Sequence, residues 1–146
     1  METMIRLEDV NEKNWRIPFA VTDEQKQYVA SSTMLLARAY AYRNARSRAY
    51  IIYSDDTPIG MGSYHDEPQF NAYIFSEFFI NAQYQGKGYG EEAARTVLDA
   101  MKADGKYCKV VLCYIQGNQA AKHLYEKLGF VETDRDENEI IMELNF

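Results

Sequence analysis

Three glycines alternate with other residues between positions 86 and 90, in a Gln-Gly-Lys-Gly-Tyr-Gly run that begins at Gln85. Glycines let the backbone turn sharply and leave its amides uncovered. A helical hydrophobic period follows directly, so these amides would sit at a helix start, where the helix dipole favours negative charge. The loop is therefore suited to a pyrophosphate. The alternative is a turn that only connects a strand to a helix.

Two common nucleotide motifs do not fit this loop. A dinucleotide-binding fingerprint would need a glycine at the position of Glu91. A mononucleotide loop needs glycine and lysine followed by serine or threonine, whereas Lys87 is followed by Gly88. The residue spacing therefore excludes both the dinucleotide-binding and the mononucleotide-binding motif. The loop would then bind a different ligand that contains a pyrophosphate.

A second motif lies downstream, where the run from Asn118 to Phe130 has the pattern N-x-x-A-x-x-L-Y-x-x-x-G-F. Together with Gln85, Gly88 and Gly90 at a strand-to-helix junction, it resembles the GNAT N-acetyltransferases over nearly the whole chain. In that family the glycine loop wraps the pyrophosphate of coenzyme A. The resemblance implies an α/β fold with a mixed, mostly antiparallel central sheet flanked by helices. It also implies acetyl-CoA as cosubstrate and no metal.

A narrower resemblance is carried by residues 78–80 (Phe-Phe-Ile) followed by 84–88 (Tyr-Gln-Gly-Lys-Gly). This run is similar to the bacterial spermidine/spermine acetyltransferase-like branch, whose strand ends in two phenylalanines before a comparable turn. That branch usually has an acidic residue two positions before the first phenylalanine. Here Ser76 occupies that place and Glu77 stands beside it. The acceptor implied is a small cationic amine, of which a polyamine is one example.

The resemblance also implies roles for individual residues. The backbone amide of Phe78 would face the thioester oxygen, and backbone groups around Phe78 and Ile80 would pair with pantetheine like an added strand. Asn118 would add a side-chain contact. The full cofactor-binding set implied is Phe78, Phe79, Ile80, Gln85, Gly86, Lys87, Gly88, Tyr89, Gly90, Glu91, Asn118, Ala121 and Tyr125.

Tyr125 is the candidate general acid. A phenol is protonated at neutral pH and can deliver its proton to a departing thiolate. The alternative is that Tyr125 belongs to the core, because it shares an apolar helix face with Leu124 and Leu128. Its place within the second motif favours the catalytic role.

The base that takes a proton from the amine is less clearly marked. Glu77 is the candidate, although alternation places its side chain opposite that of Phe78 unless a bulge shifts the register. Asp66 and Glu67, expected in a loop before that strand, could reach over the site or relay a proton through water. A solvated surface role is open for all three carboxylates.

These residues need a sheet with helices on its faces to bring them together. Alternating or apolar runs predict strands over 5–10, 49–53, 59–64, 72–80, 109–115 and 139–144, with another strand starting at 129–131. Helical spacing predicts helices over 14–20, 31–42, 91–103 and 118–128. The order is β-α-α-β-β-β-α-β-α-β-β, in one N-acetyltransferase domain over residues 1–146.

Charge and hydropathy limit the classes of partner that the protein could bind. The chain has 16 Lys and Arg against 22 Asp and Glu, a net charge of -6. This balance argues against nucleic acid, whose phosphates need a basic face, and suits a cationic small molecule. No apolar run approaches the roughly 20 residues of a membrane span. The first residues carry no sign of a secretion signal, so we expect a cytoplasmic protein without a membrane partner.

Neither the cysteines nor the histidines predict a metal site or a disulfide. Cys108 and Cys113 flank a strand-like stretch at an odd separation, so their side chains should point in opposite directions and act as small buried hydrophobes. His65 is expected in a loop, and His123 on the polar side of a helix.

Aromatic residues are frequent, with 12 tyrosines and 7 phenylalanines. Those in the first half could grip a cationic amine through cation–π contacts, or could pack in the core or at a subunit interface. They are Tyr28, Tyr40, Tyr42, Tyr64, Phe70 and Tyr73.

The leading prediction is an acetyl-CoA-dependent N-acetyltransferase. It would transfer an acetyl group to a primary amine of a small cationic acceptor, such as a polyamine, by direct attack in a ternary complex. The alternatives are acetylation of a peptide, protein or antibiotic amine, and a non-catalytic sensor that binds acyl-CoA. Small members of the family are often homodimers, so the resemblance implies a homodimer.

Overall fold

The computed structural model describes residues 4–146, which form a seven-stranded sheet in the order β1-β2-β3-β4-β5-β7-β6. Residues 1–3, where the sequence gives no sign of a secretion signal, lie outside the described residues. The strands are β1 (Ile5–Asp9), β2 (Arg48–Ser54), β3 (Thr57–Glu67), β4 (Ala72–Ile80), β5 (Lys109–Ile115), β6 (Val131–Asp136) and β7 (Glu139–Asn145). The helices are α1 (Ser32–Ala41), α2 (Tyr89–Asp104) and α3 (Gln119–Lys127). The mixed, mostly antiparallel sheet expected from the sequence is confirmed.

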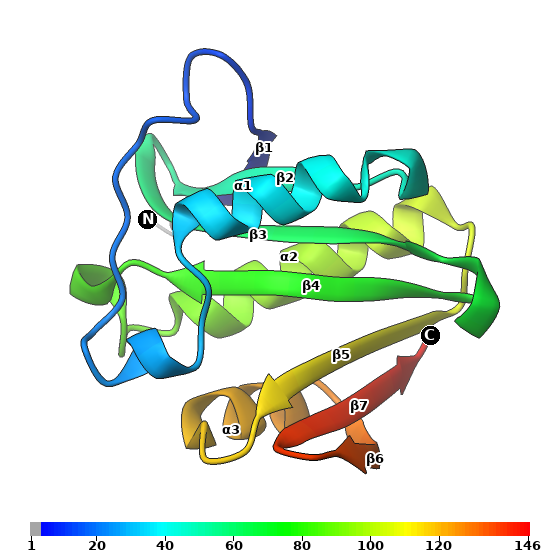
Figure 1. The fold of residues 1–146 in the computed structure, drawn as a ribbon. Coiled ribbons are helices and arrows are strands. Elements are labelled where there is room, and N and C mark those ends of the chain that lie inside the picture. Colours follow the sequence, from blue (N-terminus) through cyan, green and yellow to red (C-terminus); the bar gives the residue numbers. More distant parts are fainter. Residues whose placement is uncertain (1–3) are drawn as a thin grey trace.

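The helices cover the sheet on both faces (Figure 1). α1 packs over β2 and β3 on one face, and α2 contacts β1 and β4 on the other. α3 packs below α2, where Tyr125 and Leu128 join the same large core as the apolar side of α2. A smaller cluster beneath α1 contains Leu35, Ile51, Met61 and Phe79.

Local signals in the sequence explain where the helices begin and end. The Ser31 side chain accepts a hydrogen bond from the Met34 amide, which caps α1 at its predicted start. Gly105 has φ of 75° and closes α2, as predicted, because glycine adopts the left-handed conformation without strain. Asn118 caps α3 in the same way as Ser31 caps α1, by accepting from the Ala121 amide.

The sheet opens between β4 and β5. These strands run parallel, and within residues 4–146 they pair only at Tyr73 with Val110 and at Ile74 with Val111. Past these pairs the strands diverge, as Figure 1 shows. The second half of β4 therefore faces a gap, and its backbone groups on that edge can pair with a ligand as with an added strand.

A β-bulge lies in β4 beside this gap. Across from β4, Ser63 pairs with Glu77 and Tyr64 pairs with Phe75, so Ser76 is the extra residue. A bulge interrupts strict alternation and re-aims side chains. As a result Ser76 and Glu77 line one cavity on the α1 face, whereas Phe78 packs against the core on the α2 face.

The helix predicted over residues 14–20 does not form. Trp15 lies in a series of turns, and 47% of its surface is exposed. The physical reason is local competition: the Asn11 side chain accepts from the amides of Lys13 and Asn14, and the Asn14 side chain accepts from the Asn11 amide. Such side-chain-to-backbone bonds stabilise turns at the expense of helix.

The loop expected around His65, Asp66 and Glu67 is also wrong, because β3 extends through Glu67. Asp66 is buried and pairs with Arg46 at 2.6 Å and with Lys106 at 3.0 Å. These ion pairs permit charged residues inside the sheet, where the sequence pattern suggested a turn. The Asp66 carboxylate is therefore held in ion pairs on the α2 side of the sheet. His65 and Glu67 instead line a cavity on the α1 side.

The two cysteines are free, but both are exposed, and the expectation of buried thiols is wrong. Cys113 lies in β5 past the last pair with β4, so the gap leaves its side chain open to a cavity.

Candidate active site

The glycine loop leads from β4 into α2. Gly86 and Gly88 have φ of 76° and 85°, conformations that disfavour other residues. Gly88 is the N-cap of α2, whose first amides have no acceptor within the helix. A Cβ added to Gly86 or Gly88 would meet no described atom within 4 Å, so the loop is open on that side. The loop therefore has the uncovered amides and the helix start that suit a pyrophosphate.

Gln85 fixes the loop to its surroundings. Its side-chain Nε2 donates to the Ile80 carbonyl at 2.8 Å and to Gln25 Oε1 at 2.7 Å. These bonds connect the loop to the end of β4 and to the segment that precedes α1. The glutamine in the motif thus positions the glycines, a role that the sequence did not predict.

A cavity of about 240 Å³ lies beside the loop, between the end of β4 and α3. The predicted cofactor-binding residues that line it are Phe78, Phe79, Ile80, Gln85, Gly86, Gly90, Asn118, Ala121 and Tyr125. Four others, Lys87, Gly88, Tyr89 and Glu91, are not part of this lining. Glu91 instead pairs with Arg95 at 3.0 Å and with Lys127 at 3.5 Å, which connects α2 to α3. The lining also contains Val21, Gln25 and Val29, which the sequence did not indicate.

Tyr125 lies on the inner face of α3 and is only 9% exposed. Its ring packs edge-on against Phe75 and Phe130, so the core role weighed from the sequence is real. Its residue also lines the cavity beside the glycine loop. Burial, with smaller contributions from Glu77 and Cys113, raises the pKa of Tyr125 far above its usual range. The hydroxyl is therefore neutral at physiological pH and available as a donor.

Glu77 lies on the opposite face of the sheet, as alternation predicted relative to Phe78. Its carboxylate accepts a hydrogen bond from Arg38 Nη1 of α1 at 2.7 Å. Burial raises the pKa of Glu77, and the Arg38 charge opposes this rise without cancelling it. A carboxylate with a raised pKa is a stronger base than one in water.

The gap brings these groups together. Glu77 and Cys113 line a cavity on the α1 face of the opening between β4 and β5, and Tyr125 lines the cavity beside the glycine loop. The structure therefore places a carboxylate and a thiol on one side of the gap, and a phenol and the glycine loop on the other. Of these, Cys113 and the Arg38 partner of Glu77 were not predicted. Their only sequence signal is their position in a strand and a helix that flank the gap.

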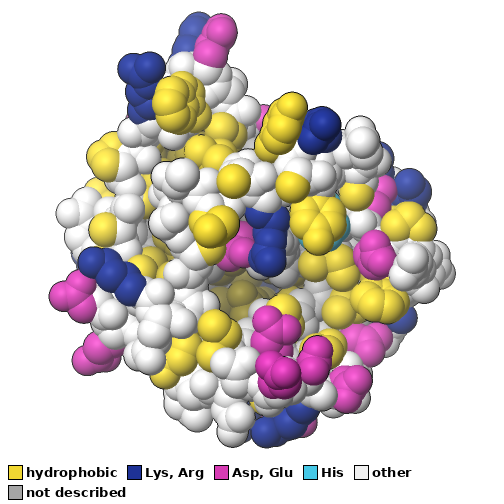
Figure 2. Space-filling model, in the orientation of Figure 1, with side chains coloured by type: hydrophobic (Ala, Val, Ile, Leu, Met, Phe, Trp, Pro, Cys, Tyr) yellow, Lys and Arg dark blue, Asp and Glu magenta, His cyan; other side chains and the backbone are white. Residues whose placement is uncertain are grey.

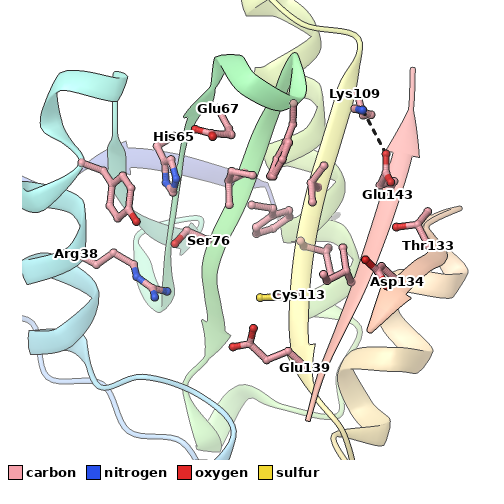
Figure 3. A pocket seen from close by; sticks show the side chains of 17 residues that line it. Arg38, His65, Glu67, Ser76, Lys109, Cys113, Thr133, Asp134, Glu139 and Glu143 are labelled. Atoms are coloured by element: carbon pink, nitrogen blue, oxygen red, sulfur yellow. Dashed lines mark ion pairs between the residues drawn. The ribbon is translucent and has the colours of Figure 1, made fainter. Parts of the chain in front are cut away.

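The α1 face carries a large cleft at the same gap. Two adjoining cavities of about 670 Å³ and 280 Å³ share Arg38, Ser76, Cys113 and Glu139 in their walls. Figure 3 shows that Cys113 and Glu139 lie at one end of the larger cavity, while Glu67, Lys109 and Glu143 lie at the other end. The smaller cavity has Glu77 in its wall.

The cleft is acidic. The walls of the larger cavity contain Glu67, Asp134, Glu139 and Glu143 against the cations Arg38 and Lys109. Figure 2 shows this hollow, with acidic side chains gathered below it over the end of the sheet formed by β6 and β7. Lys109 is paired with Glu143 at 3.4 Å and Arg38 with Glu77 at 2.7 Å. The remaining negative charge favours a cationic ligand.

The aromatic residues of the first half divide between core and cleft. Tyr64 and Tyr73 are buried in the main core. Tyr28 lines the smaller cavity, and Tyr42 and Phe70 line the larger one. Tyr40 is exposed beneath the Arg43 guanidinium. Half of the six are therefore placed where they can contact an acceptor.

A mixed sheet that splays between β4 and β5 beside a glycine loop is the fold of a class of acyl-CoA-dependent transferases. The model of the acetyltransferase (GNAT) family matches residues 7–130 of the chain. The protein belongs to this family and is an N-acetyltransferase that uses acetyl-CoA.

Known proteins similar to this chain agree with that membership. YbbJ of Bacillus subtilis, an uncharacterized N-acetyltransferase, is 26% identical over 128 residues, which cover 80% of this chain and 78% of YbbJ. A GNAT family acetyltransferase from Elizabethkingia anophelis with acetyl-CoA bound has a TM-score of 0.70 at 17% identity, covering 97% of this chain and 98% of that one. Spermidine N-acetyltransferase from Vibrio cholerae, solved with CoA and spermine, has a TM-score of 0.69 at 19% identity, covering 97% and 95%.

Two further features bear on partners. Within residues 4–146, no group of three or more His, Cys, Asp or Glu side chains could hold a metal ion. In the same range, no helix is both long enough and apolar enough to cross a bilayer.

Replacing Gly90 with alanine tests the glycine loop with little strain. Gly90 lines the cavity beside the glycine loop, and an added Cβ would lie 3.8 Å from Ile80 Cγ1, which is an ordinary van der Waals contact. We expect the variant to fold and to bind coenzyme A at least tenfold more weakly, since one hydrogen bond to a charged group contributes about 1.5–3 kcal/mol. Calorimetric titration with coenzyme A measures this.

Asp99→Ala, on the exposed side of α2 away from the loop, provides the control for a substitution in this helix. Gly88→Ala should also weaken binding, but φ of 85° adds backbone strain there, so its result is less specific. Unchanged affinity in a folded Gly90→Ala protein would show that the loop does not hold the pyrophosphate.

Proposed function

We propose that this protein transfers the acetyl group of acetyl-CoA to a primary amine of a small cationic acceptor. The transfer takes place in a ternary complex assembled across the gap between β4 and β5. The observation that carries the proposal is the placement of Glu77 and Tyr125 on opposite faces of the sheet at this gap, each in the wall of its own cavity. Each face has its own cavity, one for each substrate.

The cavity beside the glycine loop suits acetyl-CoA, the acetyl donor. Pyrophosphate would bind at Gly86 and Gly90, and the unpaired edge of β4 near Phe78 would bind the amide-rich pantetheine as an added strand. The Phe78 amide would donate to the oxyanion that develops on the thioester carbonyl. Acetyl-CoA supplies the activated acyl group.

The residues of the chain then move two protons. Glu77 accepts a proton from the acceptor ammonium, directly or through water, and the neutral nitrogen attacks the thioester carbon. As the carbon–sulfur bond breaks, the Tyr125 hydroxyl gives its proton to the sulfur. The acylated nitrogen loses its second proton to the medium, and the tyrosinate takes one back from the medium. The products are the N-acetylated amine and free coenzyme A.

The acceptor class is supported by charge. The cleft on the α1 face is acidic and contains the aromatic rings of Tyr28, Tyr42 and Phe70, a combination that binds ammonium groups. The structural likeness to the Vibrio cholerae spermidine N-acetyltransferase supports a polyamine within that class.

An acceptor panel tests this function. Purified protein is mixed with acetyl-CoA and, separately, with spermidine, spermine, butylamine, a peptide with a free amine, and an aminoglycoside, and free thiol is followed. We expect the fastest release with the polyamines. Release with only the peptide or the aminoglycoside would contradict the acceptor class. Binding of acetyl-CoA without release on any acceptor would indicate a sensor.

Replacing Arg38 with methionine should shift the pH dependence of the reaction. Arg38 is the cation that lowers the pKa of Glu77 against the effect of burial. Without it the carboxyl stays protonated to higher pH, so the acidic limb of kcat/KM should move to higher pH. Initial rates between pH 5 and 9 measure this. Arg43→Met, which removes a cation stacked on Tyr40, should leave the limb in place; an equal shift in both variants would contradict the local effect.

Two features remain predictions. A homodimer is expected from the resemblance, and sedimentation of the purified protein would test it. A cytoplasmic location is expected from the sequence, and fractionation of cells would test it.

A further inference from the structure

His65 has an unusual environment for a histidine. It is 8% exposed, yet it forms part of the wall of the larger cavity. Its ring stacks on Tyr42 with centroids 4.2 Å apart and an interplanar angle of 17°. Within residues 4–146 the imidazole forms no hydrogen bond. Burial, with a smaller contribution from Arg38, lowers its pKa against the opposing charges of Glu67 and Asp66. The ring nitrogens are not among the sealed, unpartnered atoms of the described residues, so they are open to the cavity and can bind a ligand there.

Glu67 lies beside this ring. Its charge acts on the His65 imidazole, and both side chains belong to the same face of β3. Within the described residues no cation pairs with Glu67, because Lys109 at the same end of the cavity is held by Glu143. Figure 3 shows His65 and Glu67 at this end, away from Cys113 and Glu139.

These groups share one chemical preference. A carboxylate attracts an ammonium, a neutral imidazole nitrogen accepts its N–H, and the face of a tyrosine ring favours a cation. An anion would instead meet the unpaired charge of Glu67. The lowered pKa matters because a charged imidazolium would repel the same cation.

We propose that His65, Glu67 and Tyr42 form a second ammonium site that holds the distal amine of the acceptor while its other amine reacts near Glu77. This inference rests on the proposed function and narrows it to acceptors with two or more amines.

Strand geometry gives the separation of the two sites. Glu77 is opposite Ser63, and His65 and Glu67 follow Ser63 by two and four residues along β3. With a rise of about 3.3–3.4 Å per residue, the second site lies roughly 7–13 Å from the reacting end. A short diamine could not occupy both sites, whereas a longer one could.

Binding of α,ω-diamines of increasing length tests the second site. The series runs from ethylenediamine to 1,10-diaminodecane, each compared with the monoamine of equal length, and affinity is measured by calorimetry with coenzyme A present. We expect the longer diamines to bind about tenfold or more tightly than their monoamines, as one added charged hydrogen bond implies. Ethylenediamine should show no such advantage.

Two variants locate the effect. Glu67→Gln keeps the shape and removes the charge, and His65→Phe keeps the ring stacked on Tyr42 and removes the nitrogens. Each should abolish most of the advantage of long diamines over the monoamines of equal length. Asp99→Asn, on the exposed side of α2, removes the same charge elsewhere and should retain the advantage.

The outcomes separate this inference from the proposed function. Long diamines that bind no better than monoamines, or an advantage that survives both Glu67→Gln and His65→Phe, would overturn the second site. Because the readout is binding, this holds whether or not acetyl transfer occurs. Thiol release from acetyl-CoA with monoamines and diamines alike, without any length preference in binding, would retain the proposed function and reject the second site.

Discussion

Replacing Tyr125 with phenylalanine is expected to lower turnover about 10²–10⁴-fold, the usual contribution of a proton-transfer group, while the affinity for acetyl-CoA changes little. The variant removes one hydroxyl and keeps the ring that packs against Phe75 and Phe130, so the core should be preserved. The raised pKa of Tyr125 makes the hydroxyl a weak acid, and we therefore expect a value toward the lower end of this range. Steady-state thiol release measures turnover, and calorimetry measures binding.

Tyr107→Phe is the matched control for Tyr125→Phe. Tyr107 is also buried in the main core, and its ring packs against Tyr73, away from the gap. It should retain wild-type turnover. A Tyr125→Phe enzyme that also turns over at the wild-type rate would mean that the thiolate takes its proton from water, and that Tyr125 serves the core alone.

Replacing Glu77 with glutamine is expected to lower kcat/KM about 10²–10⁴-fold near neutral pH and to remove the acidic limb of its pH profile. The sign follows from the raised pKa of Glu77, which keeps the carboxyl protonated, and so inactive as a base, at pH values where an ordinary glutamate would be ionised. In the wild-type enzyme activity should rise as pH passes through this pKa. Glutamine does not ionise, so the profile of the variant should lack this rise.

A profile measured with amines of different pKa distinguishes the enzyme from the substrate. The limb that belongs to the amine should move with the amine, whereas the limb that belongs to Glu77 should not. Glu126→Gln, on the exposed side of α3, controls for the loss of one charge. An acidic limb that is unchanged in Glu77→Gln would assign the base elsewhere.

Much of the fold could be predicted because its signals are local. The caps at Ser31 and Gly105 and the glycine loop at 86–90 depend on residues within a few positions of each other. Most residues predicted to bind the cofactor, from Phe78 to Tyr125, therefore line one cavity, and their binding role stays a prediction.

The acceptor side depends on contacts that sequence patterns do not reveal. The bulge at Ser76 and the length of β3 follow from strand pairing, and the Arg38–Glu77 ion pair joins residues 39 positions apart. The burial of Asp66 depends on two cations supplied from elsewhere in the chain. These contacts decide which carboxylate faces the reaction, and so the sequence left the base open among three.

Cys113, which lines the cleft on the α1 face of the gap, offers an alternative route, because a thiol that reached the thioester could accept the acetyl group first. Although Cys113 is exposed as a residue, partial burial of its thiol in the cleft, together with the charges of Glu139 and Glu77, raises its pKa. The thiolate is the nucleophilic form of cysteine, so a raised pKa disfavours attack by Cys113. This supports direct transfer to the amine.

The central claim is that donor and acceptor occupy the two sides of the gap at the same time. Initial rates with acetyl-CoA and spermidine varied together test it most directly. Direct transfer predicts double-reciprocal lines that intersect, and no acetyl group on Cys113 by mass spectrometry after incubation with acetyl-CoA alone. Parallel lines together with an acetylated Cys113 would contradict the ternary complex.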